Sequence, residues 1–111
     1  MILQELFEIL KTTGLSVWKY EAFQKPMPFI VYQDIESRFD TSSGTVWRKT
    51  TKVGIDVYST EDCDSETLER VLLKNKLIPT SITKIYIPEG KIINTQFDVN
   101  ISQEIYEDDL L

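Results

Sequence analysis

The 111-residue chain contains no histidine and only one cysteine, Cys63. The absence of imidazole excludes catalytic triads and metal sites that depend on histidine. A single cysteine excludes an intrachain disulfide, so the sequence does not ask for an oxidising compartment and we expect an intracellular origin. The acidic residues around Cys63, in "DCDSE", should raise the pKa of its thiol and disfavour the reactive thiolate. We therefore interpret Cys63 as a passive residue at the start of a helix.

Glycine is scarce and never clustered. The four glycines stand alone, at Gly14, Gly44, Gly54 and Gly90. Phosphate-binding loops need closely spaced glycines, so we expect none here. A calcium-binding EF-hand loop beginning at Asp62 would require glycine and glutamate where the chain has Thr67 and Leu73. Helix capping by Asp62 or Asp64 explains the same acidic segment. The sequence thus predicts no catalytic residue, no metal and no cofactor, and we expect a protein that is not an enzyme.

Basic charge and long apolar runs are also in short supply. The formal net charge is −6, and the apolar runs are far shorter than a bilayer-spanning helix needs. Tight nucleic-acid binding requires a basic face, which this balance opposes. The local cluster of Arg38, Arg48, Lys49 and Lys52 is typical of solvated positions on a hairpin. The first ten residues, "MILQELFEIL", favour an amphipathic helix over a secretory signal because glutamates interrupt the apolar residues.

The hydrophobic periodicity predicts two helices and four strands. Helices are expected at about 1–12 and 62–75, and strands at about 28–39, 46–58, 81–87 and 91–103. Residues 15–20 are compatible with a short additional strand. Gly14 should end the first helix in a left-handed conformation. We therefore predict an α+β fold of order αββαββ, with a four-stranded, mainly antiparallel sheet and two helices packed on one face. Residues 1–103 form a single domain in this interpretation, followed by an acidic tail, 104–111, that is flexible or docks on a partner.

Alternation within the strands predicts which side chains share a face. In the first long strand one face should carry Phe29, Val31, Ile35 and Phe39, and the other Ile30, Tyr32, Asp34, Glu36 and Arg38. Because both faces begin with apolar residues, we expect the start of this strand to be covered on both sides. In the other two long strands the buried stripes should be Val53, Ile55, Val57 and Ile93, Phe97, Val99, Ile101.

Two groups of apolar residues have more than one interpretation. Phe39 and Trp47 flank the loop 40–44, and they could pack against each other across the hairpin or anchor a neighbouring subunit. Tyr106, Leu110 and Leu111 near the C-terminus raise a similar choice between a frayed end and a docking segment.

Several segments, read in order, resemble a known family. The matching pieces are "GLSVWKYEAF", "PFIVYQD", "FDTSSGTVWRKT", "IDVYST" with its acidic helix start, and "IINTQFDVNI". Together they cover about residues 10–103, and they resemble the small tail-completion proteins of long-tailed bacteriophages and prophages, also called tail-terminator or tail-to-head joining proteins. None of these segments is a catalytic motif.

The resemblance implies a structural role in the virion. Such proteins are made in the host cytoplasm and form a homo-oligomeric ring, usually hexameric, on the head-proximal end of the tail tube. The ring stops polymerisation of the tube protein and meets the head connector or stopper, while DNA passes through the centre and no membrane is involved. An acidic subunit suits a channel that only conducts DNA. The expected interface residues are Phe39, Asp40, Gly44, Trp47, Arg48, Lys49, Tyr106, Leu110 and Leu111.

Two other functions remain open at this point. A head-side connector or stopper protein of similar size would occupy the same junction from the other side. An acidic cytoplasmic binding or inhibitor module would instead present a concentrated acidic face to one basic partner, whereas the acids here are spread along helix starts and strand exteriors.

Overall fold

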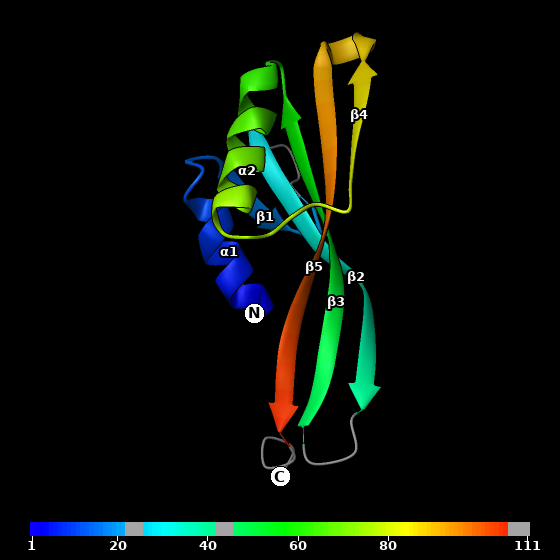
Figure 1. Cartoon of the computed structure of the whole chain (residues 1–111). Coiled ribbons are helices and arrows are strands. Elements are labelled where there is room, and N and C mark those ends of the chain that lie inside the picture. Colours follow the sequence, from blue (N-terminus) through cyan, green and yellow to red (C-terminus); the bar gives the residue numbers. More distant parts are fainter. Residues whose placement is uncertain (22–25, 42–45, 107–111) are drawn as a thin grey trace.

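The computed structural model describes residues 1–21, 26–41 and 46–106, without the side chains of Val46 and Tyr106. Figure 1 shows helices and strands in the order α1 (Leu3–Lys11), β1 (Ser16–Lys19), β2 (Phe29–Thr41), β3 (Val46–Ser59), α2 (Asp62–Lys74), β4 (Ser81–Ile87), a 3-10 turn (Pro88–Gly90) and β5 (Ile92–Tyr106). The α+β class is therefore confirmed. Gly14 has a φ of 83° just after α1, the left-handed geometry expected there.

The sheet has five strands in the order β1-β2-β3-β5-β4, one more than the four predicted. The additional strand is β1, which pairs in parallel with the start of β2, from Ser16 opposite Phe29 to Lys19 opposite Tyr32. All other neighbouring strands are antiparallel. The segment 15–20 was compatible with a strand, but its β-branched and aromatic residues did not reveal its partner or direction. The order of elements is thus αβββαββ, and the sheet is mixed.

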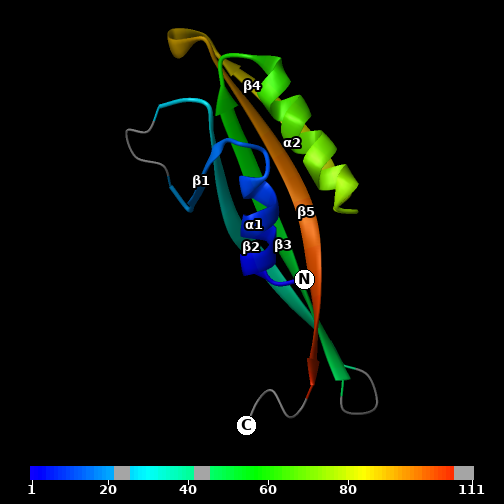
Figure 2. The ribbon, with the colours of Figure 1, turned by 90° about the vertical axis from the view of Figure 1, so that its left-hand side faces the viewer.

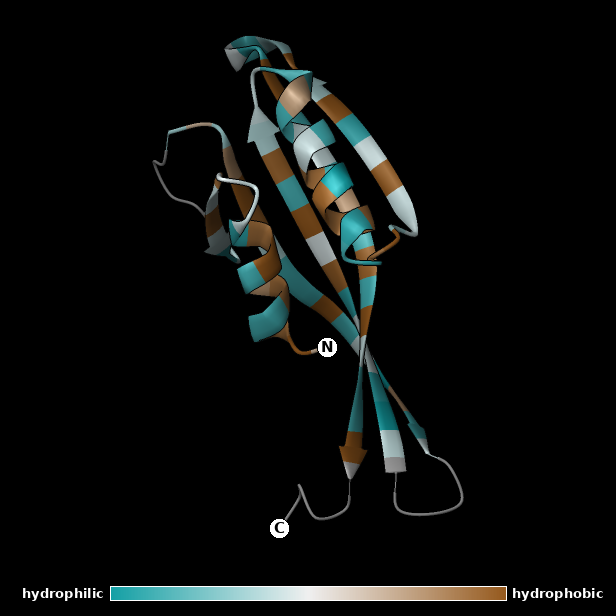
Figure 3. Cartoon of the chain, turned by 60° about the vertical axis from the view of Figure 1, so that its left-hand side comes forward, coloured by the Kyte–Doolittle hydropathy of each residue, from teal (hydrophilic) through white to brown (hydrophobic). Residues whose placement is uncertain are grey.

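Both helices cover the same face of the sheet, as predicted (Figures 1 and 2). The hydrophobic core lies between the helices and the sheet. Its buried residues are Leu6, Leu10, Ile30, Tyr32, Val53, Ile55, Val57, Leu68, Leu72, Leu77, Phe97, Val99 and Ile101. Figure 3 shows the hydrophobic bands that recur along the helices and strands. The predicted stripes of β3 and β5 are confirmed on this helix side, except that Ile93 is only half-buried. The other side of the sheet, which we call the open side, carries no helix from the described residues.

The faces of β2 differ from the prediction because the strand contains a β-bulge. The register with β3 shifts between Asp34 and Glu36, so Ile35 is an extra residue in β2. Before the bulge, Ile30 and Tyr32 point to the helix side and Phe29 to the open side. After the bulge the alternation is reversed, so that odd-numbered residues such as Phe39 point to the helix side and even-numbered residues such as Arg38 to the open side. The predicted faces are therefore wrong for the second half of β2. At its start, Ile30 and Tyr32 are buried on the helix side, whereas Phe29 and Val31 are half-buried on the open side.

The start of α2 is held differently from the capping that we expected. Glu61 occupies the N-cap position without a side-chain hydrogen bond, so neither Asp62 nor Asp64 caps the helix. The hydroxyl of Ser59 instead bonds the Asp64 carboxylate and accepts a hydrogen bond from the Glu61 backbone N–H at 3.0 Å. The ammonium of Lys84 in β4 lies 2.8 Å from the Asp62 carboxylate. The Lys84–Asp62 ion pair joins α2 to β4, whereas the Ser59 contacts join the start of α2 to the end of β3. The helix ends at Lys74, next to the expected Asn75.

The molecule is elongated, with extents of 53 × 24 × 22 Å. Its length comes from β2, β3 and β5, which continue well past the helices as a separate projection (Figure 1). The N-terminal amine bonds the carbonyl of Ser102 at the base of this projection. Because β5 continues to Tyr106, the domain boundary expected after residue 103 lies inside a strand. Among the described residues, none of the helices is long and apolar enough to cross a membrane.

Candidate functional site

The candidate site is the three-stranded projection, which we call the arm. It comprises residues 36–41 of β2, 46–52 of β3 and 100–106 of β5. β3 is the central strand and pairs along its length with both neighbours, so the arm is a continuous part of the sheet. No helix of the described ranges 1–21, 26–41 and 46–106 covers the arm (Figures 1 and 2).

The helix-side face of the arm carries aromatic and apolar side chains among polar ones. Phe39 lies directly opposite Lys49, whose ammonium is 5.8 Å from the centre of the Phe39 ring. Trp47 lies between Thr41 and Ile105 on the adjacent strands and is half-buried. Phe39 remains 61% exposed. The ring contacts found in the described part of the chain include Phe7–Tyr32 and Phe29–Tyr58 but none between Phe39 and Trp47, so they do not support the first of the two interpretations, direct packing across the hairpin.

The open-side face of the arm is charged, with opposite signs across the strands. Asp40 lies opposite Arg48, which in turn lies opposite Glu104, and Glu36 lies opposite Lys52. Cross-strand pairs of opposite charge favour this register, although exposed ion pairs add little to stability. The two faces of the arm therefore differ sharply in chemistry: one can be buried in an apolar contact, and the other suits polar contact or solvent.

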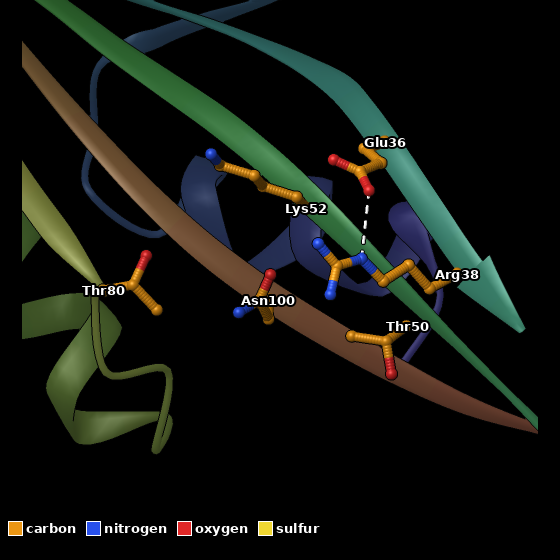
Figure 4. Close-up of a pocket in the computed structure, with 6 residues that line it drawn as sticks. All are labelled: Glu36, Arg38, Thr50, Lys52, Thr80 and Asn100. Carbon is orange, nitrogen blue, oxygen red and sulfur yellow. Dashed lines mark hydrogen bonds and ion pairs between the residues drawn. The ribbon is translucent and has the colours of Figure 1, made fainter. Parts of the chain in front are cut away.

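A hollow of about 230 Å³ lies on the open side, at the base of the arm. Figure 4 shows its lining side chains: Glu36, Arg38, Thr50, Lys52, Thr80 and Asn100. Arg38 Nε lies 3.0 Å from Glu36 Oε1, and Lys52 Nζ lies 3.9 Å from Asp98 Oδ2. Because both cations have carboxylate partners, the charge of the hollow is balanced. It has the character of a polar depression between strands rather than of an anion-binding pocket.

The predicted interface residues that the structure describes all lie on the arm. Phe39, Trp47 and Lys49 share the helix-side face, whereas Asp40 and Arg48 share the open-side face. The backbone of Tyr106 is the end of β5 and lies opposite Val46, and its side chain is outside the described part. Gly44, Leu110 and Leu111 lie outside the described residues.

Two features of the surface escaped the sequence analysis. Ile105 belongs to the same face as Trp47, because β5 runs three residues past the predicted end of the strand. The alternation in "SQEIY" was the available signal for this extension. The second feature is β4, whose seven residues form one outer edge of the sheet and are almost all exposed.

Among the described residues, the ionisable groups whose pKa departs from the ordinary value are spread over both faces of the sheet and the start of α2. Burial raises the pKa of Asp56 on the open side, while a hydrogen bond from the Tyr20 hydroxyl lowers the pKa of Asp34 on the helix side. The two carboxyl groups thus lie on opposite faces of the sheet. A hydrogen bond to Glu61 raises the pKa of the exposed Cys63 thiol, in the expected direction. The described residues contain no cluster of side chains that could hold a metal ion.

No family model matches the chain, and no curated protein matches its sequence. The shape of the arm, the chemistry of its two faces and the segment resemblance are therefore the observations from which a function can be inferred.

Proposed function

We propose that this chain is a structural subunit of a long-tailed phage virion that assembles into a ring on the head-proximal end of the tail tube. The ring, a hexamer in the family that the sequence resembles, ends polymerisation of the tube and joins the tail to the head connector or stopper. DNA passes through its centre without being held. In this proposal the protein works by shape and contact, and it catalyses no reaction.

The arm is the observation that carries this proposal. It extends a body of modest width into a molecule 53 Å long, and it keeps Phe39 61% exposed beside the half-buried Trp47. Aromatic side chains of this kind are costly to leave in water, and they are enriched at the centres of protein interfaces. An uncovered arm with an aromatic face is therefore suited to lie against a neighbouring subunit.

The predicted interface residues have distinct roles in this proposal. Phe39 and Trp47 are the apolar anchors of the helix-side face, and Lys49 partly covers the Phe39 ring. Asp40 and Arg48 on the open-side face set the polar complementarity with the neighbour, which fixes orientation more than affinity. The remaining interface residues proposed from the sequence are Gly44, Tyr106, Leu110 and Leu111.

The net charge supports the view that DNA is a passing cargo rather than a ligand. At −6 the subunit repels the phosphate backbone on average, and the cations lining the hollow on the open side are paired with carboxylates. A ring of such subunits would let DNA slide through. Its firm contacts would be with copies of itself, with the tail tube protein and with the head-side connector.

The proposal is tested by mixing the purified protein with isolated tail tubes and with isolated heads, and imaging both. We expect rings at one end of each tube and tubes that stop growing at a defined length. Attachment to heads alone would support the head-side connector function instead. Stable one-to-one binding to a basic protein, without self-assembly, would support the acidic inhibitor function.

A further inference from the structure

The outer strand β4 is an unusually bare sheet edge. Ser81–Ile87 pairs with β5 on one side, and no described strand pairs with its other side. Six of its seven residues are exposed. An edge of this kind presents a row of unpaired backbone N–H and C=O groups, and it is a template for pairing with another strand.

Exposed apolar side chains gather around this edge. Five of the ten large hydrophobic residues that are exposed in the described part lie on or beside β4: Leu73, Ile78, Ile82, Ile85 and Tyr86. Leu73 belongs to this group because it follows Asp62 by eleven residues, about three helical turns, and therefore lies on the same side of α2. That side faces β4, since Asp62 bonds Lys84. The edge is thus apolar as well as unpaired.

Natural edges are usually protected by charges, proline or bulges, and β4 has little such protection. Its single charged residue is Lys84, and the ammonium of that residue is held by Asp62 at 2.8 Å. The register between β4 and β5 is regular from Ser81 to Ile87. An exposed apolar edge without these devices is typical of a strand that another chain covers.

The opposite side of the sheet offers a second free edge. β1 pairs with Phe29–Tyr32 of β2, and no described strand pairs with residues 33–41 on the side away from β3, where the Tyr20 hydroxyl bonds the Asp34 carboxylate. Ile35 and Phe39, two more of the exposed large hydrophobic residues, lie in this stretch. We call residues 33–41 the free β2 edge.

The surroundings of the two edges carry opposite charge. β4 itself has one charged residue, Lys84, and the flanking residues 74–80 and 88–91 add three lysines and one glutamate. The free β2 edge has three acidic residues and one arginine. Complementary charge favours their approach and disfavours the contact of two β4 edges with each other.

We propose that the β4 edge of one copy pairs with the free β2 edge of the next copy, so that the sheets of neighbouring subunits continue into one another. This inference rests on the self-assembly proposed above, and it names the seam between subunits. The contact is head-to-tail, because it joins two different edges of the same chain. Each copy added leaves one edge of each kind open until the assembly closes into a ring.

The seam is tested by disulfide mapping in the full chain with Cys63→Ser as background. Thr83→Cys in β4 is combined in turn with Gln33→Cys, Glu36→Cys or Arg38→Cys, which scan the register on the open side of β2. Within one chain, β3 and β5 separate the two strands by about 14 Å, too far for a disulfide. Any bond that forms therefore joins two copies.

Under oxidising conditions, we expect at least one of the three double-cysteine variants to form disulfide-linked oligomers, seen as a ladder of bands in a non-reducing gel. Thr83→Cys combined with Arg70→Cys on the exposed side of α2 is the matched control, and it should give no ladder. Rings that form without a ladder would overturn the seam while leaving the ring function intact. Efficient dimers of Thr83→Cys alone would also overturn it, since they indicate β4 against β4. A chain that remains monomeric at every concentration would overturn both proposals.

A charge placed on the edge gives an independent readout. Ile85→Glu places a negative charge at an exposed position of β4, opposite the acidic free β2 edge, and we expect it to raise the concentration needed for assembly by about tenfold or more. Gln4→Glu adds the same charge on the exposed side of α1 and should leave assembly unchanged. Equal assembly of the two variants, with equal melting temperatures, would contradict the proposed seam.

Discussion

Phe29 and Phe39 lie on the same strand, ten residues apart, yet their side chains lie on opposite faces of the sheet. The bulge at Ile35 is the reason, because one extra residue reverses the alternation for the rest of β2. Phe29 consequently stacks on Tyr58 on the open side, whereas Phe39 joins Trp47 on the helix side of the arm. The aromatic face of the arm exists because of this reversal.

Removing the aromatic side chains of the arm should weaken assembly. Phe39→Ala should change the free energy of unfolding by no more than about 0.5 kcal/mol, since Phe39 is 61% exposed. At an interface the same truncation can cost about 2 kcal/mol of association. Trp47→Ala should lower both the stability of the fold and the affinity between subunits, because Trp47 is half-buried within the subunit. Thermal unfolding and sedimentation of the same samples separate the two effects. A large fall in melting temperature for Phe39→Ala, with assembly intact, would show that Phe39 serves folding only.

Gly54→Ala tests the packing at the bulge. A Cβ on Gly54 would lie 2.9 Å from Cδ1 of Ile35, the end of an exposed side chain that can shift, so we expect the alanine to cost less than about 1 kcal/mol. In an Ile35→Ala background this clash is absent, and alanine should instead stabilise the strand by about 0.5 kcal/mol. Denaturant unfolding of the four variants gives this double-mutant cycle. Additive effects would mean that Ile35 does not lie over Gly54.

The neighbouring residues Leu72 and Leu73 of α2 should behave differently when each is replaced by alanine. Leu72 is fully buried in the core, and its truncation should cost about 2–5 kcal/mol of stability. Leu73 is 49% exposed beside the β4 edge, so its truncation should leave stability nearly unchanged and weaken assembly. Chemical unfolding and sedimentation of the pair test this contrast. Similar stability losses in both variants would mean that Leu73 also belongs to the core.

Asp56 and Asp34 should give opposite dependences of stability on pH. Burial raises the pKa of Asp56, so the folded state binds its proton more tightly than the unfolded chain, and stability is lost as pH rises through the folded pKa. Asp56→Asn should therefore be more stable than the parent at pH 7, with a difference that shrinks below about pH 4.

For Asp34 the sign is reversed. The Tyr20 hydroxyl lowers the pKa of Asp34, so its contribution is present above the ordinary pKa and is lost as pH falls through the folded pKa. Asp34→Asn should be less stable than the parent at pH 7 and should approach it in acid. Melting temperatures measured from pH 3 to 8 check both variants. The same sign for both would contradict the environments described for them.

Much of the fold could be predicted because its signals are local. The stripe of α1, the alternation of β3 and β5 and the end of α2 near Asn75 each follow from residues that are close in the sequence. The parallel pairing of β1 could not be predicted, because the direction of a four-residue strand depends on contacts with the distant residues of β2. The reversal at Ile35 also escaped, since a bulge is set by register against β3 and Gly54 alone hinted at it.

Residues of the arm could be singled out from the sequence, but the form of the arm could not. Phe39, Trp47 and Arg48 attracted attention because aromatic and basic residues flank a hairpin loop, and the structure places all three on the arm. That the arm has three strands depends on the length of β5, whose last residues lie in a tail that we expected to leave the sheet. The edge position of β4 depends on the order of the strands in the sheet, which the residues of one strand do not determine.

The measurement that tests the central claim most directly is the mass and shape of the purified full-length chain over a range of concentrations, by sedimentation and electron microscopy. We predict closed rings of a single copy number, with tail tubes shifting the equilibrium further toward them. A particle that stays monomeric at all concentrations, with or without tubes, would contradict the claim that this protein acts by assembling with copies of itself.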